Sequence, residues 1–194
     1  PSKKCFELMK NFRKKHPGIP MSIMAYVNLA AAKGPEDFFA RAAAAGADAV
    51  LLPDVPISMR VAEPLWDEAA AKAGIDMPAI APPNASNEVL AEVAKRSGSY
   101  TYLLSRAASR ERMLRGTILT SLERGSPALE RRADAPRFGV SEPKHVAQAR
   151  AMGASGVIVG SAIGKIIEDN LAEKTKLLEA LKAYAAGMKA ATKL

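Results

Sequence analysis

The chain has 194 residues, of which 48% are hydrophobic and 25% charged, so it is long enough for one globular domain with a hydrophobic core. No run approaches the roughly 18 apolar residues of a membrane-spanning helix, and the first residues lack the apolar stretch of a secretory signal. The single cysteine, Cys5, excludes an internal disulfide, so we expect a cytoplasmic protein with no membrane contact.

The net charge of +8 raises the question of nucleic-acid binding. Most of the excess lies in residues 101–150, where arginines are interspersed with glutamates, a pattern typical of a solvated helix face. No aromatic residue stands between Arg106 and Arg132 to stack on bases. We therefore expect no nucleic-acid partner.

Six short segments have the composition of β-strands. Most are runs of Val, Ile, Leu, Met or Ala rather than apolar–polar alternations, which favours parallel strands buried on both faces. In chain order these segments are 19–27, 48–53, 77–81, 98–104, 136–140 and 155–160.

Helical patterns lie before and between these strands, and their alternation with the strands predicts parallel βαβ topology. A helix over 142–152 is predicted to start at Ser141-Glu142-Pro143, with a hydroxyl cap, an acid in the first turn and a proline where no amide donor is needed. The apolar stripes at helical spacing are Cys5, Met9 and Phe12; Val61, Leu65 and Ala69; and Leu177, Leu181, Tyr184 and Met188.

A parallel sheet of about six strands fits either an open doubly wound fold or part of a (β/α)8 TIM barrel. The sequence opens on a helix, whose strand in a barrel would have been lost, and a complete barrel needs about 250 residues. The chain is therefore about two βα units short of a barrel. We see no linker and expect an α/β protein with a single domain over residues 1–194, an N-terminally incomplete TIM barrel.

Two glycine turns follow the last two predicted strands. Gly139 leads into the helix 142–152, and Gly160-Ser161 leads into the helix that contains Lys165. A glycine lets the backbone approach a ligand closely, and a helix start offers unpaired amides to an anion. In barrels a phosphate site is often built at the last two strands. We expect phosphate binding here; tight strand–helix turns are the alternative explanation of both glycines.

Six segments, in order, resemble those of tryptophan synthase α subunits. The resemblance covers essentially the whole chain and starts in the helix after that family's second strand. The segments are HPGIPMSIMAYVNL (16–29), LLPDVP (51–56), APPNAS (81–86), GSYTYLLSR (98–106), RFGVSEP (137–143) and VGSAIGKIIEDN (159–170).

The resemblance implies a lyase of tryptophan biosynthesis that cleaves indole-3-glycerol phosphate to indole and glyceraldehyde 3-phosphate. The carbon–carbon bond breaks only after the indole is tautomerised and protonated at C3, which requires a glutamate and an aspartate as proton-transfer groups. In the family both acids lie on the second strand and the loop after it, and these 194 residues contain no counterpart. We expect little or no turnover from this chain alone.

The resemblance also assigns the remaining pocket. Gly139, Gly160 and Ser161 match the family's phosphate-binding turns, and the Ser161 amide and hydroxyl are donors. Tyr102 matches a substrate-facing tyrosine with a supporting role in catalysis; an ordinary core tyrosine is the alternative. Ile80 and Phe138 match apolar wall positions. No metal site is expected.

The loop after the second predicted strand matches the family's interface with its β subunit. Asp54 and Pro56 lie in this loop, and Asp54 is equally explained as a turn or helix cap. The family's α chain has no cofactor of its own, and pyridoxal phosphate belongs to the β subunit, which receives the indole.

One loop departs from the family. A Gly-Val-Thr-Gly sequence is expected soon after Ser105-Arg106, but Ala108, Arg110 and Glu111 stand approximately where its glycines and threonine would be. That loop closes the family's site, and Glu111 would repel phosphate. The change in residues 107–112 therefore keeps a second hypothesis open, a non-catalytic homologue that binds phosphate or docks to a β-type partner.

Two further expectations concern a different enzyme class and the exposed edges of the sheet. A different phosphate-sugar barrel enzyme is a third hypothesis, which the Tyr-Thr-Tyr-Leu-Leu-Ser-Arg and Pro-Pro-Asn-Ala segments disfavour. An open barrel also exposes the edges of strands 19–27 and 155–160, and unprotected edges recruit other chains. We therefore expect self-association through these edges unless the absent units are supplied.

Overall fold

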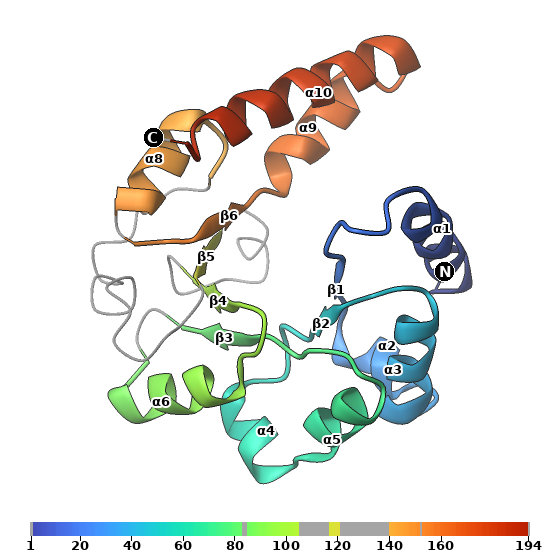
Figure 1. Ribbon diagram of the computed structural model, residues 1–194, viewed down its shortest axis with the longest axis vertical. Helices are drawn as coiled ribbons and strands as arrows, with labels where there is room; N and C mark the ends of the chain where they lie inside the picture. Colours follow the sequence, from blue (N-terminus) through green and yellow to red (C-terminus); the bar gives the residue numbers. More distant parts are fainter. Residues whose placement is uncertain (1, 83–84, 105–116, 121–139, 152, 194) are drawn as a thin grey trace. The chain divides into compact units, whose positions relative to one another are not determined.

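The computed structural model describes residues 2–82, 85–104, 117–120, 140–151 and 153–193 (Figure 1). The chain forms two compact units. The first unit comprises residues 1–80 and 87–101, and the second comprises residues 81–86 and 102–194. The single domain over residues 1–194 stays a prediction, and each unit is described by itself.

The first unit alternates helices with short strands, as the sequence predicts. Its elements are α1 (Ser2–Lys15), β1 (Ser22–Met24), α2 (Val27–Ala31), α3 (Pro35–Ala44), β2 (Ala49–Leu51), α4 (Ile57–Ala62), α5 (Leu65–Lys72) and α6 (Asn87–Arg96). β3 (Ala79–Ala81) and β4 (Thr101–Leu103) each contain residues of both units.

β1 and β2 are parallel, with Ile23 opposite Val50. The Val50 amide also donates to the carbonyl of Asp76 over 2.9 Å, which adds an isolated parallel bridge ahead of β3. All three residues of β2 are buried, as expected for a strand covered on both faces. The core around them includes Phe39 and Trp66. The predicted parallel pairing is confirmed for these strands.

The stripe predicted for α1 is wrong in part. Cys5 and Phe12 are exposed, while Phe6 and Met9 pack against the core of the first unit. Arg13 continues this side of the helix: its guanidinium donates to the Gly46 carbonyl from Nε at 3.0 Å and Nη2 at 2.7 Å. The long polar side chain thus anchors the end of the buried face and satisfies the partly buried Gly46 carbonyl.

The single helix implied by Val61, Leu65 and Ala69 is also wrong. α4 ends at Ala62 and α5 begins at Leu65, because Pro64 cannot continue a helix in which its nitrogen would have to donate. Val61 and Leu65 are exposed, whereas Ala69 is buried in the core.

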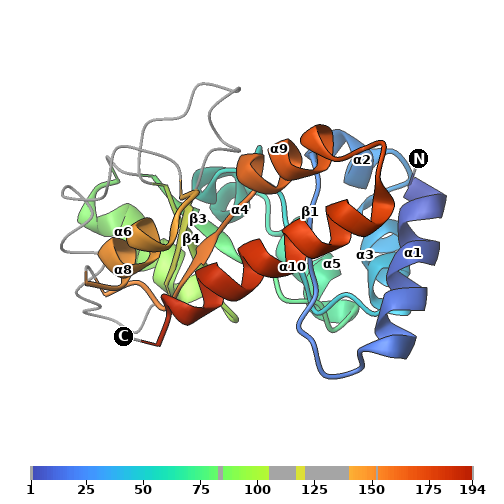
Figure 2. The ribbon, with the colours of Figure 1, turned by 90° about the horizontal axis from the view of Figure 1, so that it is seen from above.

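The second unit contains the C-terminal elements. They are β5 (Thr117–Thr120), α8 (Pro143–Ala151), β6 (Gly156–Ile158), α9 (Ser161–Asp169) and α10 (Lys174–Ala190). α10 packs against both α8 and α9 (Figures 1 and 2).

The four-stranded sheet departs from the predicted all-parallel order. Its strand order is β3-β4-β5-β6, and β5 pairs with β6 in antiparallel fashion, with Ile118 opposite Val157. No strand was expected at 117–120, so the neighbour of β6 is a strand that the apolar pattern missed. Of the predicted strand 136–140, all but Val140 lies outside the described residues.

The stripe predicted for α10 is confirmed. Met188 is buried and Leu177, Leu181 and Tyr184 are half-buried, while Leu178 is exposed. Met188 forms a small core with Val140 and Val146, against which Tyr184 packs. This cluster holds α8 and α10 together at the segment that precedes α8.

No helix among the described residues is long and apolar enough to span a membrane.

Candidate functional site

The start of α9 presents backbone amides to solvent. Gly160 is the N-cap residue and Ser161 the first helical residue, and both are exposed. Gly160 has no side chain with which to cap the helix, and the first bond within it runs from the Gly164 amide to the Gly160 carbonyl over 3.0 Å. The amides before Gly164 therefore have no acceptor within the helix, and the helix dipole adds partial positive charge there. This arrangement suits an anion.

At the start of α8, side chains hold the backbone of the two residues that precede the helix. Nδ1 of the buried His145 accepts hydrogen bonds from the amides of Ser141 and Glu142, both at 3.2 Å. The hydroxyl of Tyr184, on α10, donates to the Ser141 carbonyl over 3.0 Å. Pro143 begins this helix, as predicted. The capping hydrogen bonds are made by His145, three residues after the cap residue Glu142, and not by the predicted hydroxyl of Ser141.

The charges at this start are balanced. Glu142 and Lys144 form an exposed ion pair of 2.7 Å, and the hydrogen bond from Lys144 lowers the pKa of Glu142 below its usual value. Burial raises the pKa of Tyr184, so its hydroxyl keeps its proton and remains a donor at neutral pH.

Tyr102 lies in β4 and is only 3% exposed. Its neighbours in the strand, Thr101 and Leu103, are buried as well. The burial of Tyr102 is what an ordinary core tyrosine would show. Its role toward a substrate stays a prediction. Ile80 is half-buried in β3, and its role as an apolar wall stays a prediction.

Asp54 caps a helix. Its two carboxylate oxygens accept the Val27 amide at 2.9 and 3.1 Å, at the start of α2. The bond satisfies a donor that has no partner within the helix. Pro56 is exposed at the N-cap position of α4. Both residues are accessible, and their place in an interface stays a prediction.

The predicted site residues divide between the units. Tyr102, Gly160 and Ser161 belong to the second unit, and Ile80, Asp54 and Pro56 to the first. Gly139, Phe138 and the altered loop 107–112 lie outside the described residues.

The sequence reasoning missed His145 and Tyr184 as polar contributors. A signal existed for His145: a glutamate or glutamine three residues after a helix cap commonly reaches back to the cap amide, and His145 holds that position. No local signal exists for Tyr184, because its acceptor is 43 residues away.

The sequence also missed Arg60. Its guanidinium is buried, pairs with Asp67 through Nε at 3.1 Å, and donates from Nη1 to the Pro78 carbonyl at 3.3 Å. These bonds join α4, α5 and the segment before β3. We assign this pair a structural role, because a buried cation requires partners and Asp67 and the Pro78 carbonyl supply them.

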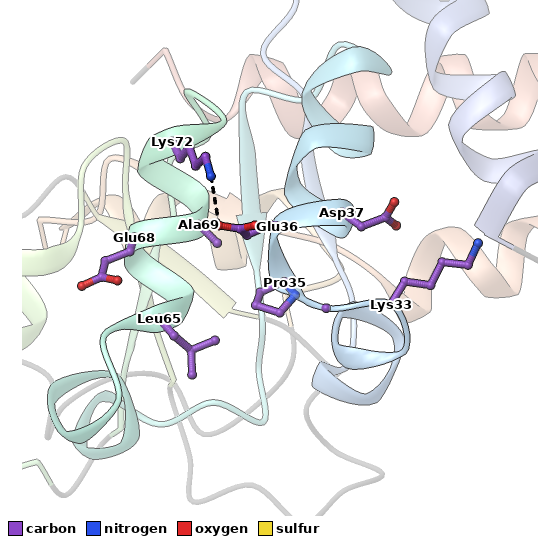
Figure 3. A pocket seen from close by; sticks show the side chains of 9 residues that line it. Lys33, Pro35, Glu36, Asp37, Leu65, Glu68, Ala69 and Lys72 are labelled. Carbon is purple, nitrogen blue, oxygen red and sulfur yellow. Dashed lines mark hydrogen bonds and ion pairs between the residues drawn. The ribbon is translucent and has the colours of Figure 1, made fainter.

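A pocket of about 670 Å³ lies between the start of α3 and the side of α5 (Figure 3). Acidic and basic side chains line it together, and Lys72 pairs with Glu36 across it at 3.0 Å. Both partners are exposed, so the pair stabilises the fold little. The pocket contains none of the predicted site residues.

The comparisons with known proteins identify the same family over nearly the whole chain. The family model for "Tryptophan synthase alpha chain" matches residues 1–193. The tryptophan synthase alpha chain of Vibrio vulnificus (strain YJ016) is 43% identical over 195 residues, which cover 97% of this chain and 69% of that one. The alpha chain of Escherichia coli (strain SMS-3-5) is 39% identical over 196 residues, covering 97% and 70%.

The fold is similar to that of solved structures. A Pyrococcus furiosus chain from a study of the tryptophan synthase a2b2 complex superposes with a TM-score of 0.75 at 29% identity. The superposition covers 98% of this chain and 74% of that chain.

Proposed function

The chain belongs to the tryptophan synthase alpha chain family, and on this premise we propose that it is the α-type carbon–carbon lyase, with indole-3-glycerol phosphate as substrate and indole and glyceraldehyde 3-phosphate as products. The observation that carries the proposal is the family match over residues 1–193. The same matches confirm the predicted TIM barrel class and argue against another phosphate-sugar barrel enzyme. No observation favours the non-catalytic homologue.

The phosphate group of the substrate binds, we propose, at Gly160, Ser161 and Gly139. The exposed amides at the start of α9 support this placement, because they point partial positive charge at a position where a dianion gains several hydrogen bonds. The Ser161 hydroxyl adds a donor. Ile80 and Phe138 would contact the indole as apolar walls, and Tyr102 would support catalysis from its strand.

Cleavage needs proton transfer at the indole and at the hydroxyl that becomes the aldehyde. No residue of this sequence matches the family's catalytic glutamate and aspartate. Asp54 follows β2, but its two oxygens are engaged by the Val27 amide. We therefore propose that these 194 residues bind the substrate but release indole very slowly by themselves.

Indole release tests the proposal directly. The chain is incubated with indole-3-glycerol phosphate, and the alpha chain of Vibrio vulnificus serves as the matched active control. We expect substrate binding and turnover at least about 100-fold below the control, since each missing acid–base group costs roughly 10²–10⁴-fold. Turnover equal to the control would contradict the proposed inactivity, and absence of substrate binding at millimolar concentration would contradict the proposed function.

The partner we propose is the tryptophan synthase β subunit, contacted through the loop that contains Asp54 and Pro56. The solved relative described as part of an a2b2 complex supports this choice. Pyridoxal phosphate would then reside on the β subunit, with no cofactor on this chain, and the assembly would work in the cytoplasm. Pro56→Glu places a charge at the loop and is expected to weaken β-subunit binding in a calorimetric titration. Ser58→Glu, at the next exposed position, is the matched control.

Self-association through strand edges also remains a proposal. Among the described residues, β1 pairs only with β2, and β6 stands at the end of its sheet. Met24 of β1 is 46% exposed, so apolar surface accompanies the open edge. Sedimentation at micromolar to high micromolar concentration should show dimers or larger species. A stable monomer with a cooperative thermal transition would contradict the proposal.

A further inference from the structure

One side of α1 is both apolar and exposed. Cys5, Leu8 and Phe12 follow one another at spacings of three and four residues, which place them on one line along the helix. Leu8 is 71% exposed and Phe12 is 37% exposed, and Cys5 is exposed as well. We call these three residues the α1 stripe.

The α1 stripe lies beside the face that α1 buries. The ring of Phe6 packs against that of Phe38 in α3, with centroids 6.1 Å apart, and Met9 is half-buried in the same core. At about 100° per residue, the stripe covers an exposed arc of about 60° that adjoins Met9. The first unit therefore covers only part of the apolar surface that α1 provides.

Basic side chains stand at the other edge of the stripe. Lys4 and Lys15 are about three turns apart, so they project in nearly the same direction, on the side of the stripe away from Met9. Both are exposed, and neither forms an ion pair with any residue that the structure describes. Glu7 is the only acid of α1, which contains five lysines and Arg13. The free edge of the stripe is thus positively charged.

The width and the charge of the stripe select its partner. A narrow line at spacings of three and four is the seam along which a second helix packs, whereas a helix that lies in a lipid surface presents a broader apolar face. A second copy of the chain would bring Lys4 and Lys15 against the same residues, and like charges repel. A helix with acidic residues beside its apolar line complements both features.

We propose that the α1 stripe docks one amphipathic helix of a separate polypeptide, whose acidic residues lie beside its apolar line and pair with Lys4 and Lys15. Leu8 and Phe12 supply most of the apolar contact. The stripe is about two turns long, so the complex is weak and transient. The inference is independent of the proposed function, because none of the predicted site residues lies in α1.

Cys5 reports directly on the cover of the stripe, because it is the only cysteine in the sequence. The probe is a synthetic helix of about four heptads with leucine at positions a and d and glutamate at e and g. A peptide with lysine at e and g is the matched control. The rate of Cys5 alkylation by the uncharged reagent iodoacetamide locates the contact, and calorimetric titration measures the affinity. We expect the acidic peptide to slow alkylation at least about fivefold and the lysine peptide to leave it unchanged.

Leu8→Ser tests the apolar contact. Because Leu8 is largely exposed, its replacement should not disturb the fold, which a thermal melt checks. The affinity for the acidic peptide should fall at least about tenfold. Leu178→Ser is the matched control, because Leu178 on α10 is 57% exposed and lies in the second unit. It should leave the affinity unchanged.

Reversal of charge tests the basic edge. Lys4→Glu combined with Lys15→Glu should weaken the acidic peptide about tenfold and make the lysine peptide bind instead. Lys176→Glu combined with Lys182→Glu changes the net charge equally at exposed positions of α10. This control should change neither affinity by more than about twofold, because distant charges are screened.

Contrary results would overturn the inference. Unchanged alkylation of Cys5 with the acidic peptide at millimolar concentration would show that no such helix docks there, and equal protection by both peptides would remove the role of Lys4 and Lys15. Protection that grows with the concentration of the chain alone would assign the stripe to a second copy. Protection by phosphatidylglycerol vesicles but not by the peptide would assign it to a lipid surface. The proposed function is decided separately, by indole release and substrate binding.

Discussion

The starts of α8 and α9 have opposite arrangements of backbone donors. Each follows a glycine in the sequence, Gly139 or Gly160, and each was predicted to offer amides to phosphate. At α8, two amides donate to His145, and Tyr184 holds the intervening carbonyl. At α9, Gly160 provides no side-chain cap, and Ser161 is exposed. A glycine shortly before a helix therefore does not by itself leave the following backbone amides free, because at α8 a side chain holds two of them.

The larger part of the phosphate affinity should come from the start of α9. A charge placed there should therefore have the largest effect on phosphate binding. Ser161→Asp puts a carboxylate where the amides are exposed, so it should compete with phosphate and repel it, weakening binding at least about tenfold. The fold should not suffer, because an acid in the first turn stabilises a helix by about 0.3–1 kcal/mol. Phosphate titration and urea denaturation provide the two measurements. A loss of both affinity and stability would mean that Ser161 has a structural role only.

Removing only the hydroxyl at the same position should have a smaller effect. Ser161→Ala retains the backbone amide and deletes one donor, so we expect phosphate affinity to fall about threefold to tenfold. The comparison with Ser161→Asp separates the hydroxyl from the amides. Equal losses in the two variants, measured by the same titration, would indicate that the amides contribute nothing.

At the start of α8, the main effect of a substitution should be on the free energy of unfolding. Tyr184→Phe deletes the donor to Ser141 and should lower the free energy of unfolding by roughly 0.5–1.5 kcal/mol at neutral pH. Amide exchange should rise at the start of α8 and stay unchanged at Gly164 in α9. Tyr26→Phe, on a side chain that is 49% exposed, is the control expected to change nothing.

The effect of Tyr184→Phe on the free energy of unfolding should also depend on pH. The pKa of Tyr184 is raised in the folded protein by burial, so its contribution is complete below the pKa of an unfolded tyrosine, about 10, and is lost as the pH rises toward the folded value. Denaturation at pH 7 and pH 10.5 should therefore show a smaller difference between wild type and Tyr184→Phe at the higher pH. An equal difference at both values would contradict the burial argument.

The smallest effect should come from Glu142, which is exposed to solvent. Its pKa is lowered by the hydrogen bond and charge of Lys144, so its contribution to stability is present above the pKa of an unfolded glutamate, about 4.3, and disappears as the pH falls through the folded value. Glu142→Gln should differ from the wild type only slightly near neutral pH and not at all at pH 2. Phosphate affinity should stay within about twofold, because an exposed pair is well screened.

Much of the fold could be predicted because its causes are local. The apolar run around Val50 became a buried parallel strand, and the stripe that contains Tyr184 and Met188 became the packed side of α10. Pro143 begins α8 as expected. The break between α4 and α5 was equally local, at Pro64, and could have been predicted from the same rule.

The rest depended on partners that are distant in the sequence. Helical spacing in α1 permits neighbouring stripes, and only the position of the core selects Phe6 over Phe12. β5 became the neighbour of β6 through pairing across a long sequence separation, which its composition does not encode.

The candidate site shows the same division. The sequence alone determined the family and the helix start at Gly160 and Ser161, because these follow from residue identity and from the chain geometry of a few neighbours. Tertiary structure decided that Asp54 holds the Val27 amide and that Tyr184 holds the Ser141 carbonyl. Buried or helix-end polar groups require partners, and which side chain reaches them is set by the packing of elements rather than by any single segment.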